Sequence, residues 1–294
     1  MAPSPNLEVS GFNIPQDWGI QGASASVLDK CEKPEVSVSG LQLIALIFSG
    51  IFAGILAGFL GIGGGTVMVP ILVTLGYAPI QAVATSSLAI IITALSGSIQ
   101  NWRMGYLDFR RVLLLGLPAL ITAQFGVLLA SSLPDRMLLL AFAILLACNL
   151  YLVGVRKQLA RRDDAQAKRA ALWNPTVARV FTGGTAGFMA GLLGVGGGVI
   201  MVPLQMVLLG EPIKQAIQTS LGVVVITAIA STLGHAVQGN VVWIAGIVLG
   251  FGGLISAQLS TRILPKLPDQ IVSALFRTLL AVLIVYTLWQ AFQQ

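Results

Sequence analysis

Two glycine clusters are the residues of this chain best suited to chemistry. They read Gly61-Ile62-Gly63-Gly64-Gly65 and Gly194-Val195-Gly196-Gly197-Gly198. Because adjacent glycines favour non-helical φ and each costs roughly 1 kcal/mol relative to alanine in a helix, we predict a helix break at each cluster. The half-helices that follow, from Thr66 and Val199, then point unpaired N–H groups and positive dipole ends at the breaks. Two such ends favour an anion, and the candidate residues are Gly63, Gly64, Gly65, Thr66, Gly196, Gly197, Gly198 and Val199.

A structural interpretation of the same glycines is that small residues let membrane helices pack closely. Duplication favours the binding interpretation, because a proline follows each cluster five residues on, at Pro70 and Pro203, and paired helix breaks mark binding sites in transporters. Broken backbone at membrane depth is tolerated only where it is buried in protein or lines a wet cavity. A phosphate-binding P-loop is excluded, because no Lys-Ser or Lys-Thr pair follows either cluster.

A second polar group consists of hydroxyl side chains, which we expect at the start of two long helices. Its members are Thr85, Ser86, Ser87, Thr219 and Ser220. Such hydroxyls can cap the helix or donate hydrogen bonds to a substrate oxyanion. Both roles hold at once if the capped end faces the cavity.

Two titratable side chains in or near the apolar segments are further candidates. His235, the only histidine, faces Trp102 of the other half and can relay a proton or hydrogen-bond at an interface. Arg277 is the only charge inside a confident span, six residues past Ile271, where it can contact substrate or extend towards the membrane surface. One histidine cannot form a multi-ligand metal site, so we expect no metal and no cofactor.

Two glutamines occupy equivalent apolar positions. Gln124 and Gln258 need hydrogen-bond partners if buried, and we interpret them as contacts between helices, with substrate binding as the alternative. Cys148 lies in an apolar run and behaves as a small hydrophobic residue.

The two halves of the chain are copies of each other. Residues 54–70, GILAGFLGIGGGTVMVP, match residues 187–203, GFMAGLLGVGGGVIMVP, at an offset of 133. The same offset aligns TSSL at 85–88 with QTSL at 218–221, and the offset becomes 134 further along. Internal duplication in a membrane chain is typical of transporters whose site lies between the repeats.

Composition shows which solvent surrounds the chain. Of 294 residues, 56% are hydrophobic and 10% are charged, against about 25% charged in soluble domains. This excludes an ordinary cytosolic enzyme, a disordered polymer and a disulfide-rich scaffold. The formal net charge of +6 does not indicate a nucleic-acid partner, since too few residues remain to make a basic face.

The apolar segments predict an all-α integral membrane protein. A span needs about 20 residues, and eight segments qualify: 41–60, 83–100, 112–130, 137–155, 177–193, 216–233, 241–260 and 271–291. Two shorter segments, 66–76 and 199–209, follow the glycine clusters. Each repeat therefore has a glycine-broken helix pair plus three long transmembrane helices. The expected divisions are a tail at 1–39, repeat 1 at 40–155, a linker at 156–176 and repeat 2 at 177–294.

The basic residues predict the topology. The linker carries seven cations up to Arg179 against two acids, so we place it in the cytoplasm. Inverted repeats then put Lys214, Arg262 and Lys266 inside, whereas parallel repeats put them outside. Across the whole chain the two arrangements differ little, and the second half favours inverted repeats.

The duplicated GxGGGxxxxP, the Thr/Ser-Ser-Leu element and the basic central linker resemble the sulfite exporter TauE/SafE family, from about Leu41 to the C-terminus. The resemblance implies an inner-membrane transporter of sulfur-containing or other small organic anions, such as sulfite or sulfonates.

We therefore expect a secondary transporter of small anions that works by alternating access, with the lipid bilayer and a small oxyanion as its partners. A passive pore or a structural membrane subunit is the alternative. An intramembrane enzyme is disfavoured, because the sequence has no HExxH, no paired-aspartate motif and no nucleophile beside a base. All eleven acids fall in the tail or loops, so coupling must use His235, water, backbone carbonyls or the anion's own proton.

Overall fold

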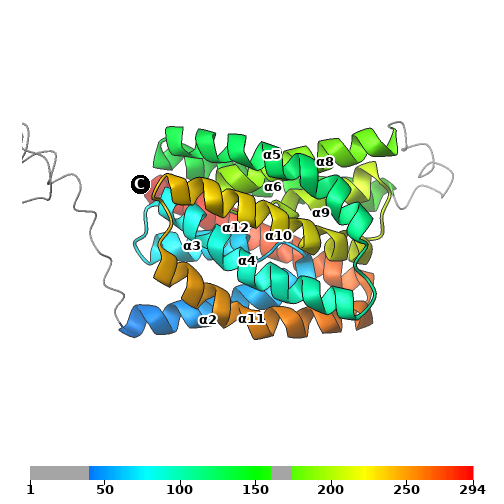
Figure 1. The fold of residues 1–294 in the computed structure, drawn as a ribbon, viewed down its shortest axis with the longest axis horizontal. Coiled ribbons are helices and arrows are strands. Elements are labelled where there is room, and N and C mark those ends of the chain that lie inside the picture. Colours follow the sequence, from blue (N-terminus) through cyan, green and yellow to red (C-terminus); the bar gives the residue numbers. More distant parts are fainter. Residues whose placement is uncertain (1–39, 160–173, 294) are drawn as a thin grey trace, which may run out of the picture. The chain divides into compact units, whose positions relative to one another are not determined.

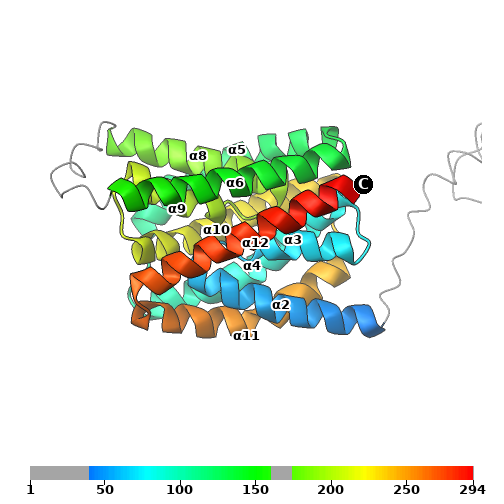
Figure 2. The same cartoon turned by 180° about the vertical axis from the view of Figure 1, so that it is seen from behind.

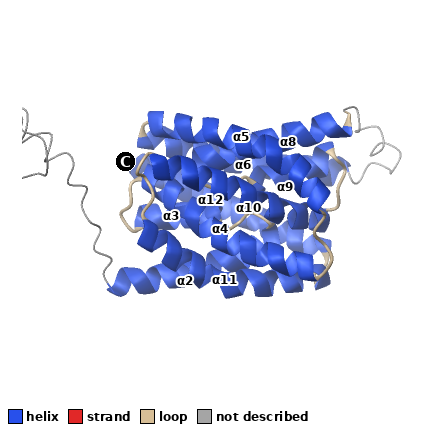
Figure 3. Cartoon of the chain, in the orientation of Figure 1, coloured by secondary structure: helices blue, strands red, loops and turns tan. Residues whose placement is uncertain are grey.

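A computed structural model describes residues 40–159 and 174–293 of the chain, and within these ranges it contains helices and no strand (Figures 1 and 3). The tail and most of the linker lie outside the described residues. The first half contains α2 (Gly40–Leu60), α3 (Gly65–Thr74), α4 (Pro79–Arg103), α5 (Phe109–Ser132) and α6 (Asp135–Leu159). The second half contains α8 (Pro175–Leu193), α9 (Gly198–Leu208), α10 (Ile213–Val237), α11 (Trp243–Ile263), the short 3₁₀ helix η1 (Leu264–Lys266) and α12 (Asp269–Gln293).

These helices confirm the predicted all-α class and occupy all ten expected segments. In the described ranges, six helices are long and apolar enough to cross a membrane: α2, α4, α5, α10, α11 with η1, and α12. The helices after the glycine clusters, α3 and α9, have 10 and 11 residues. At about 1.5 Å per residue neither can cross a hydrocarbon core of about 30 Å.

Helices of one repeat pack on helices of the other. α2 packs along α11 and α5 packs along α8, and these two pairs are equivalent under the duplication. A Cβ atom added at Gly187 on α8 would lie 2.1 Å from the Ala119 carbonyl oxygen on α5. A Cβ atom added at Gly54 on α2 would lie 2.4 Å from the Gly253 carbonyl oxygen on α11. Close helix packing by small residues thus occurs at the glycines spaced by four: Gly50, Gly54, Gly58, Gly183, Gly187 and Gly191.

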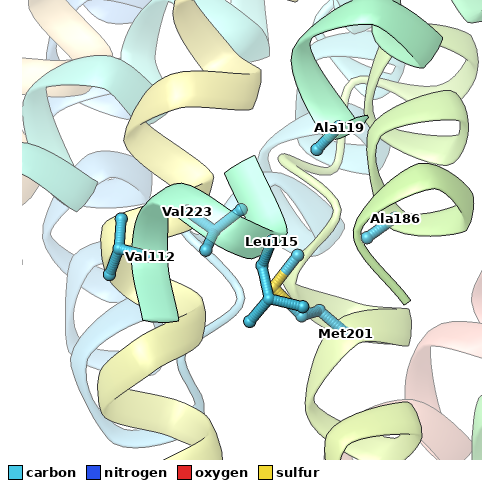
Figure 4. Close-up of a cluster of buried hydrophobic side chains, with 6 residues drawn as sticks. All are labelled: Val112, Leu115, Ala119, Ala186, Met201 and Val223. Atoms are coloured by element: carbon cyan, nitrogen blue, oxygen red, sulfur yellow. The ribbon is translucent and has the colours of Figure 1, made fainter. Parts of the chain in front are cut away.

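A buried hydrophobic cluster shows the same mixing of repeats (Figure 4). Its members come from α5 of the first repeat and from α8, α9 and α10 of the second: Val112, Leu115, Ala119, Ala186, Met201 and Val223. Because one core contains residues of both halves, the two repeats form a single packed unit over the described residues.

The register of the duplication differs from the expected one. α3 and α9 begin 133 residues apart, but α9 is one residue longer, and α4 and α10 begin 134 residues apart. The expected offset of 133 through residues 85–88 is therefore wrong, because the extra residue lies before α10. Thr85 corresponds to Thr219 and Ser86 to Ser220, and the counterpart of His235 is Asn101, not Trp102.

The two ends of the helical bundle differ in charge. One end, which we call the basic end, is formed by residues 103–111, 209–214 and 262–269, joined by ion pairs of Arg111 with Glu211 and of Lys214 with Asp269. The opposite end is formed by residues 131–136 and 238–242, where the Gln238 side-chain amide donates to the Ser131 hydroxyl (3.3 Å). The cations of these three basic-end segments are Arg103, Arg110, Arg111, Lys214, Arg262 and Lys266, and Arg179 near the start of α8 acts electrostatically on Glu211.

The chain direction also differs between the repeats. α2 begins at the opposite end, where α12 finishes (Figure 1). α8 begins at the basic end, beside the last residues of α6, as the view from behind also shows (Figure 2). Equivalent helices α2 and α8 therefore run in opposite directions through the bundle.

Candidate functional site

The helix breaks lie at the two predicted glycine clusters. Gly64 precedes α3 with φ 85°, and Gly197 precedes α9 with φ 77°. Both angles lie in the left-handed region that favours glycine. The short helices begin at Gly65 and Gly198, one residue earlier than expected. Residues 61–65 and 194–198 are called the first and second glycine loops below.

The two glycine loops contact each other. A Cβ atom added at Gly65 would lie 2.6 Å from the Gly194 carbonyl oxygen, and one added at Gly198 would lie 2.3 Å from the Gly61 carbonyl oxygen. All residues of both loops are buried. The site is therefore a junction of the two repeats closed to solvent, with the amino ends of α3 and α9 meeting there.

Four hydroxyl groups hold the loops in place. Ser86 on α4 donates to the Gly194 carbonyl oxygen (2.9 Å), and Ser220 on α10 donates to the Gly61 carbonyl oxygen (2.7 Å). Each of these bonds joins a long helix of one repeat to the glycine loop of the other. We call these two bonds the cross-repeat clasp.

The other two hydroxyl groups belong to residues that the sequence analysis missed. Thr93 donates to the Gly63 carbonyl oxygen (3.0 Å) and Thr227 donates to the Gly196 carbonyl oxygen (2.7 Å). Each of these bonds stays within its own repeat. A sequence signal for these two threonines exists: they are 134 residues apart, which is the offset that aligns α4 with α10.

Of the two roles considered for the predicted Thr/Ser cluster, helix capping is wrong. α4 begins at Pro79 after Ala78, and α10 begins at Ile213 after Pro212, with no side-chain cap at either start. The Thr/Ser cluster consequently lies in the second turn. There Thr85 accepts a hydrogen bond from the Val242 backbone N–H (3.1 Å) across to α11, whereas Ser87 is 3.0 Å from the Ser231 hydroxyl of α10 and Thr219 is buried.

Hydrogen-bond donors remain open where the loops meet. The backbone N–H groups of residues 62–66 and 195–199 donate no hydrogen bond to any residue that the structure describes. The Thr66 hydroxyl is fully buried and also has no partner among the described residues. Its counterpart in the second repeat is Val199, so only one of the two helix starts carries a hydroxyl. Buried unpaired donors at two helix amino ends are suited to an anion.

Three of the predicted site residues lie in other contacts. Gln124 donates from its side-chain amide to the Ala230 carbonyl oxygen (2.7 Å), which ties α5 to α10 as the helix-contact interpretation expects. Gln258 is half-buried on α11. His235 Nε2 is 3.0 Å from the Gly191 carbonyl oxygen and is fully buried. None of these three joins the hydrogen bonds of the glycine loops in the described chain.

Arg277 lies half-buried on α12, eight residues after that helix begins at Asp269. It is the one cation of α12, and Ala143 on α6 is its counterpart under the duplication. The described acids, Asp108, Asp135, Glu211 and Asp269, all lie at helix ends. Among the described residues the middle of the bundle therefore contains no carboxylate that would repel an anion.

Comparison with known proteins places these features in a family context. The model of the family described as Sulfite exporter TauE/SafE matches residues 46–287. Probable membrane transporter protein YunE of Bacillus subtilis is 25% identical over 250 residues, which cover 77% of this chain and 91% of that relative. Probable membrane transporter protein YdhB of the same organism is 27% identical over 222 residues, covering 75% and 90%. A probable membrane transporter protein of Xylella fastidiosa is 26% identical over 255 residues, covering 85% and 96%.

Proposed function

This chain belongs to the sulfite exporter TauE/SafE family. From that premise we propose that it is a secondary transporter, for export or uptake, of small sulfur-containing anions such as sulfite or organosulfonates, and that it alternates access between its two repeats. Membrane transport itself is supported by similarity and structure together. Its relatives are probable membrane transporters, and six described helices could cross a membrane, so the chain is a multi-pass membrane protein that serves transport.

The open donors at the glycine loops carry the anion proposal. Two helix amino ends, a buried Thr66 hydroxyl without a partner and unpaired backbone N–H groups lie together at the junction of the repeats. A sulfonate or sulfite group presents several acceptor oxygens and needs such donors. Helix dipoles add a favourable field at both starts.

Alternating access needs a contact between the repeats that can break and re-form, and the cross-repeat clasp supplies a candidate. Ser86 and Ser220 each bind the loop of the other repeat. In our proposal, one clasp bond opens while the other holds, so that the anion site faces one side of the membrane at a time.

The proposed topology has inverted repeats in a bacterial-type inner membrane, with the linker in the cytoplasm. Supporting observations are the opposite directions of α2 and α8 (Figure 1) and the cations gathered at the basic end. Positive residues favour the cytoplasmic side.

The test is anion-driven current or flux in proteoliposomes containing the purified full chain. We expect saturable transport of sulfite or methanesulfonate, with counterflow when unlabelled anion is present on the far side. Gly64→Ala and Gly197→Ala should reduce it strongly, because the added Cβ atoms would lie 2.9 Å and 2.5 Å from backbone oxygens and φ is positive at both positions.

The matched control is Gly184→Ala, whose Cβ would have only the Thr122 methyl carbon within 4 Å, at 3.7 Å. It should transport like the original chain. Flux that rises linearly with concentration and shows no counterflow would indicate a passive pore. Wild-type flux in both loop variants would refute the anion site.

A further inference from the structure

A pocket of about 500 Å³ opens at the basic end, between the start of α5 and the start of α10. Its lining includes the side chains of Arg111, Lys214, Gln215 and Gln218. The first turns of two helices, beginning at Phe109 and Ile213, also border it. Two cations, two amides, the Asp108 carboxylate and two helix amino ends thus surround one small pocket.

Both cations are held in place but remain accessible. Arg111 lies 3.0 Å from an Asp108 carboxylate oxygen and 3.5 Å from a Glu211 carboxylate oxygen. Lys214 lies 3.3 Å from an Asp269 carboxylate oxygen and donates to the Pro265 carbonyl oxygen (3.2 Å). Their side chains are still 31% and 29% exposed. Each cation is therefore oriented by protein groups and can still donate to a ligand in the pocket.

The pocket leads towards the glycine loops. Gln218, on its wall, is 93% buried, and Ser220 two residues later donates to the Gly61 carbonyl oxygen. The backbone of the preceding residue, Ile217, lies against Gly61. Gln218 and Ser220 are therefore about 3 Å apart along the axis of α10, so the pocket wall and the clasp bond that holds the first glycine loop belong to the same stretch of this helix.

The duplication shows that the fold does not require these polar groups. At the equivalent positions of the other repeat, 134 residues away, Arg111 corresponds to Ala245, Lys214 to Ile80 and Gln218 to Ala84. Those residues occupy the same places on equivalent helices. Gln215 differs from these three, because its counterpart is also a glutamine, Gln81. At the other three positions a purely structural role would be met by small or apolar side chains, and the polar groups occur only at the basic end.

We propose that this pocket is a docking site at the basic end, where Arg111, Lys214 and Gln218 bind a small oxyanion before it reaches the glycine loops, and that the Glu211 carboxylate competes with that anion for Arg111. The proposal rests on the proposed function and adds a second, one-sided anion site to it. Charge-assisted hydrogen bonds from the two cations are the strong contacts. The opposite end has no equivalent set in the described residues, so the two sides of the transporter differ in apparent anion affinity.

Glu211 also makes the docking site sensitive to pH. Burial raises the pKa of its carboxyl group, an effect that nearby Arg111 and Arg179 oppose and Asp108 reinforces. The other charged residues that line the pocket beside Arg111 are Lys214, three residues after Glu211, and Asp108, whose carboxylate pairs with Arg111. When pH falls through the raised pKa, Glu211 becomes neutral and Arg111 loses one competing carboxylate. Anion affinity should therefore increase as pH falls.

The experiment measures methanesulfonate, which stays ionised throughout, by thermal stabilisation of the detergent-purified chain and by flux in proteoliposomes at about pH 5 and about pH 8. Arg111→Gln and Lys214→Gln should each raise the half-saturating concentration roughly tenfold while the maximal flux changes little. Glu211→Gln should lower the half-saturating concentration and remove the dependence of that concentration on pH. Arg262→Gln and Lys266→Gln, which change cations of the same end outside the pocket lining, are the matched controls.

The possible outcomes separate the two proposals. If the unaltered chain neither transports nor binds an anion, the proposed function fails. If it transports normally but Arg111→Gln and Lys214→Gln behave like the two controls, the docking site is refuted while transport stands. Arg111→Lys keeps the charge but loses the bidentate geometry, so we expect partial recovery relative to Arg111→Gln. A Glu211→Gln variant with unchanged pH dependence would overturn the competition by Glu211.

Discussion

Thr66, which directly follows the first glycine loop, distinguishes the start of α3 from the start of α9. Its hydroxyl is buried at the start of α3 and has no hydrogen-bond partner in the described chain. An unpaired buried hydroxyl lowers stability by about 1–3 kcal/mol. Val199, at the equivalent place, shows that the fold accepts an apolar side chain there. The cost of Thr66 is therefore explained if the hydroxyl binds the transported anion.

Replacing Thr66 with valine separates stability from binding. Thr66→Val should leave the unfolding midpoint unchanged or slightly higher, because it removes an unpaired polar group and keeps the side-chain shape. Methanesulfonate binding should weaken about tenfold, as expected when a hydrogen bond to a charged group is lost. Thermal shift with increasing anion concentration measures both quantities in one experiment.

Thr182 offers the matched control, because its hydroxyl is also fully buried without a partner among the described residues but lies on α8 away from the glycine loops. Thr182→Val should leave anion binding unchanged. Equal anion affinity in Thr66→Val and the original chain would show that the Thr66 hydroxyl is not part of the site.

At the scale of helices, the sequence predicts where each element lies better than which elements touch. The glycine clusters and apolar lengths predict all ten segments, because helix breaks and span lengths are local properties. The partner of Ser86 could not be predicted, since Gly194 lies 108 residues away and only the packing of the repeats brings it near.

The expected offset of 133 between the Thr/Ser elements was wrong for a similar reason. The extra residue of α9 lies in an apolar stretch, where neither composition nor the matching Ser-Leu dipeptides locate it. Thr93 was missed for another reason, because a threonine in an apolar helix commonly bonds its own backbone. Its bond to Gly63 depends on a loop 30 residues earlier in the chain.

The glycines of α8 allow a test of helix packing. Gly187→Ala places a Cβ atom 2.1 Å from the Ala119 carbonyl oxygen, so α5 and α8 must separate, at a cost of about 1–3 kcal/mol typical of overpacking. The unfolding midpoint should fall clearly. Gly184→Ala, three residues earlier on the same helix, should keep or raise the midpoint, because alanine favours helix and its nearest contact is 3.7 Å. Similar midpoints for the two variants would contradict the close approach of α5 and α8.

At the scale of the whole molecule, the charge difference between the two ends links topology to function. The basic end contains the cations expected on the cytoplasmic side, together with the pocket lined by Arg111 and Lys214. In our proposal one set of residues therefore has two roles: it orients the chain in the membrane and attracts the anion. In the proposed topology an anion arriving from the cytoplasm meets this pocket first, so we expect a lower half-saturating concentration on the cytoplasmic side than on the other side.

Cysteine labelling in intact cells tests this orientation. In a variant with Cys31 and Cys148 replaced by serine, Gln238→Cys at the opposite end should react with a membrane-impermeant maleimide added outside. Lys266→Cys at the basic end should react only after the membrane is permeabilised. Both positions border helix ends that the structure describes, on either side of α11. Because α11 connects these two positions, a single crossing by α11 requires them to lie on opposite sides of the membrane.

Labelling of Lys266→Cys from outside, with Gln238→Cys protected, would reverse the topology and place the docking pocket on the periplasmic face. Labelling of both from one side would exclude α11 as a crossing and with it the inverted repeats.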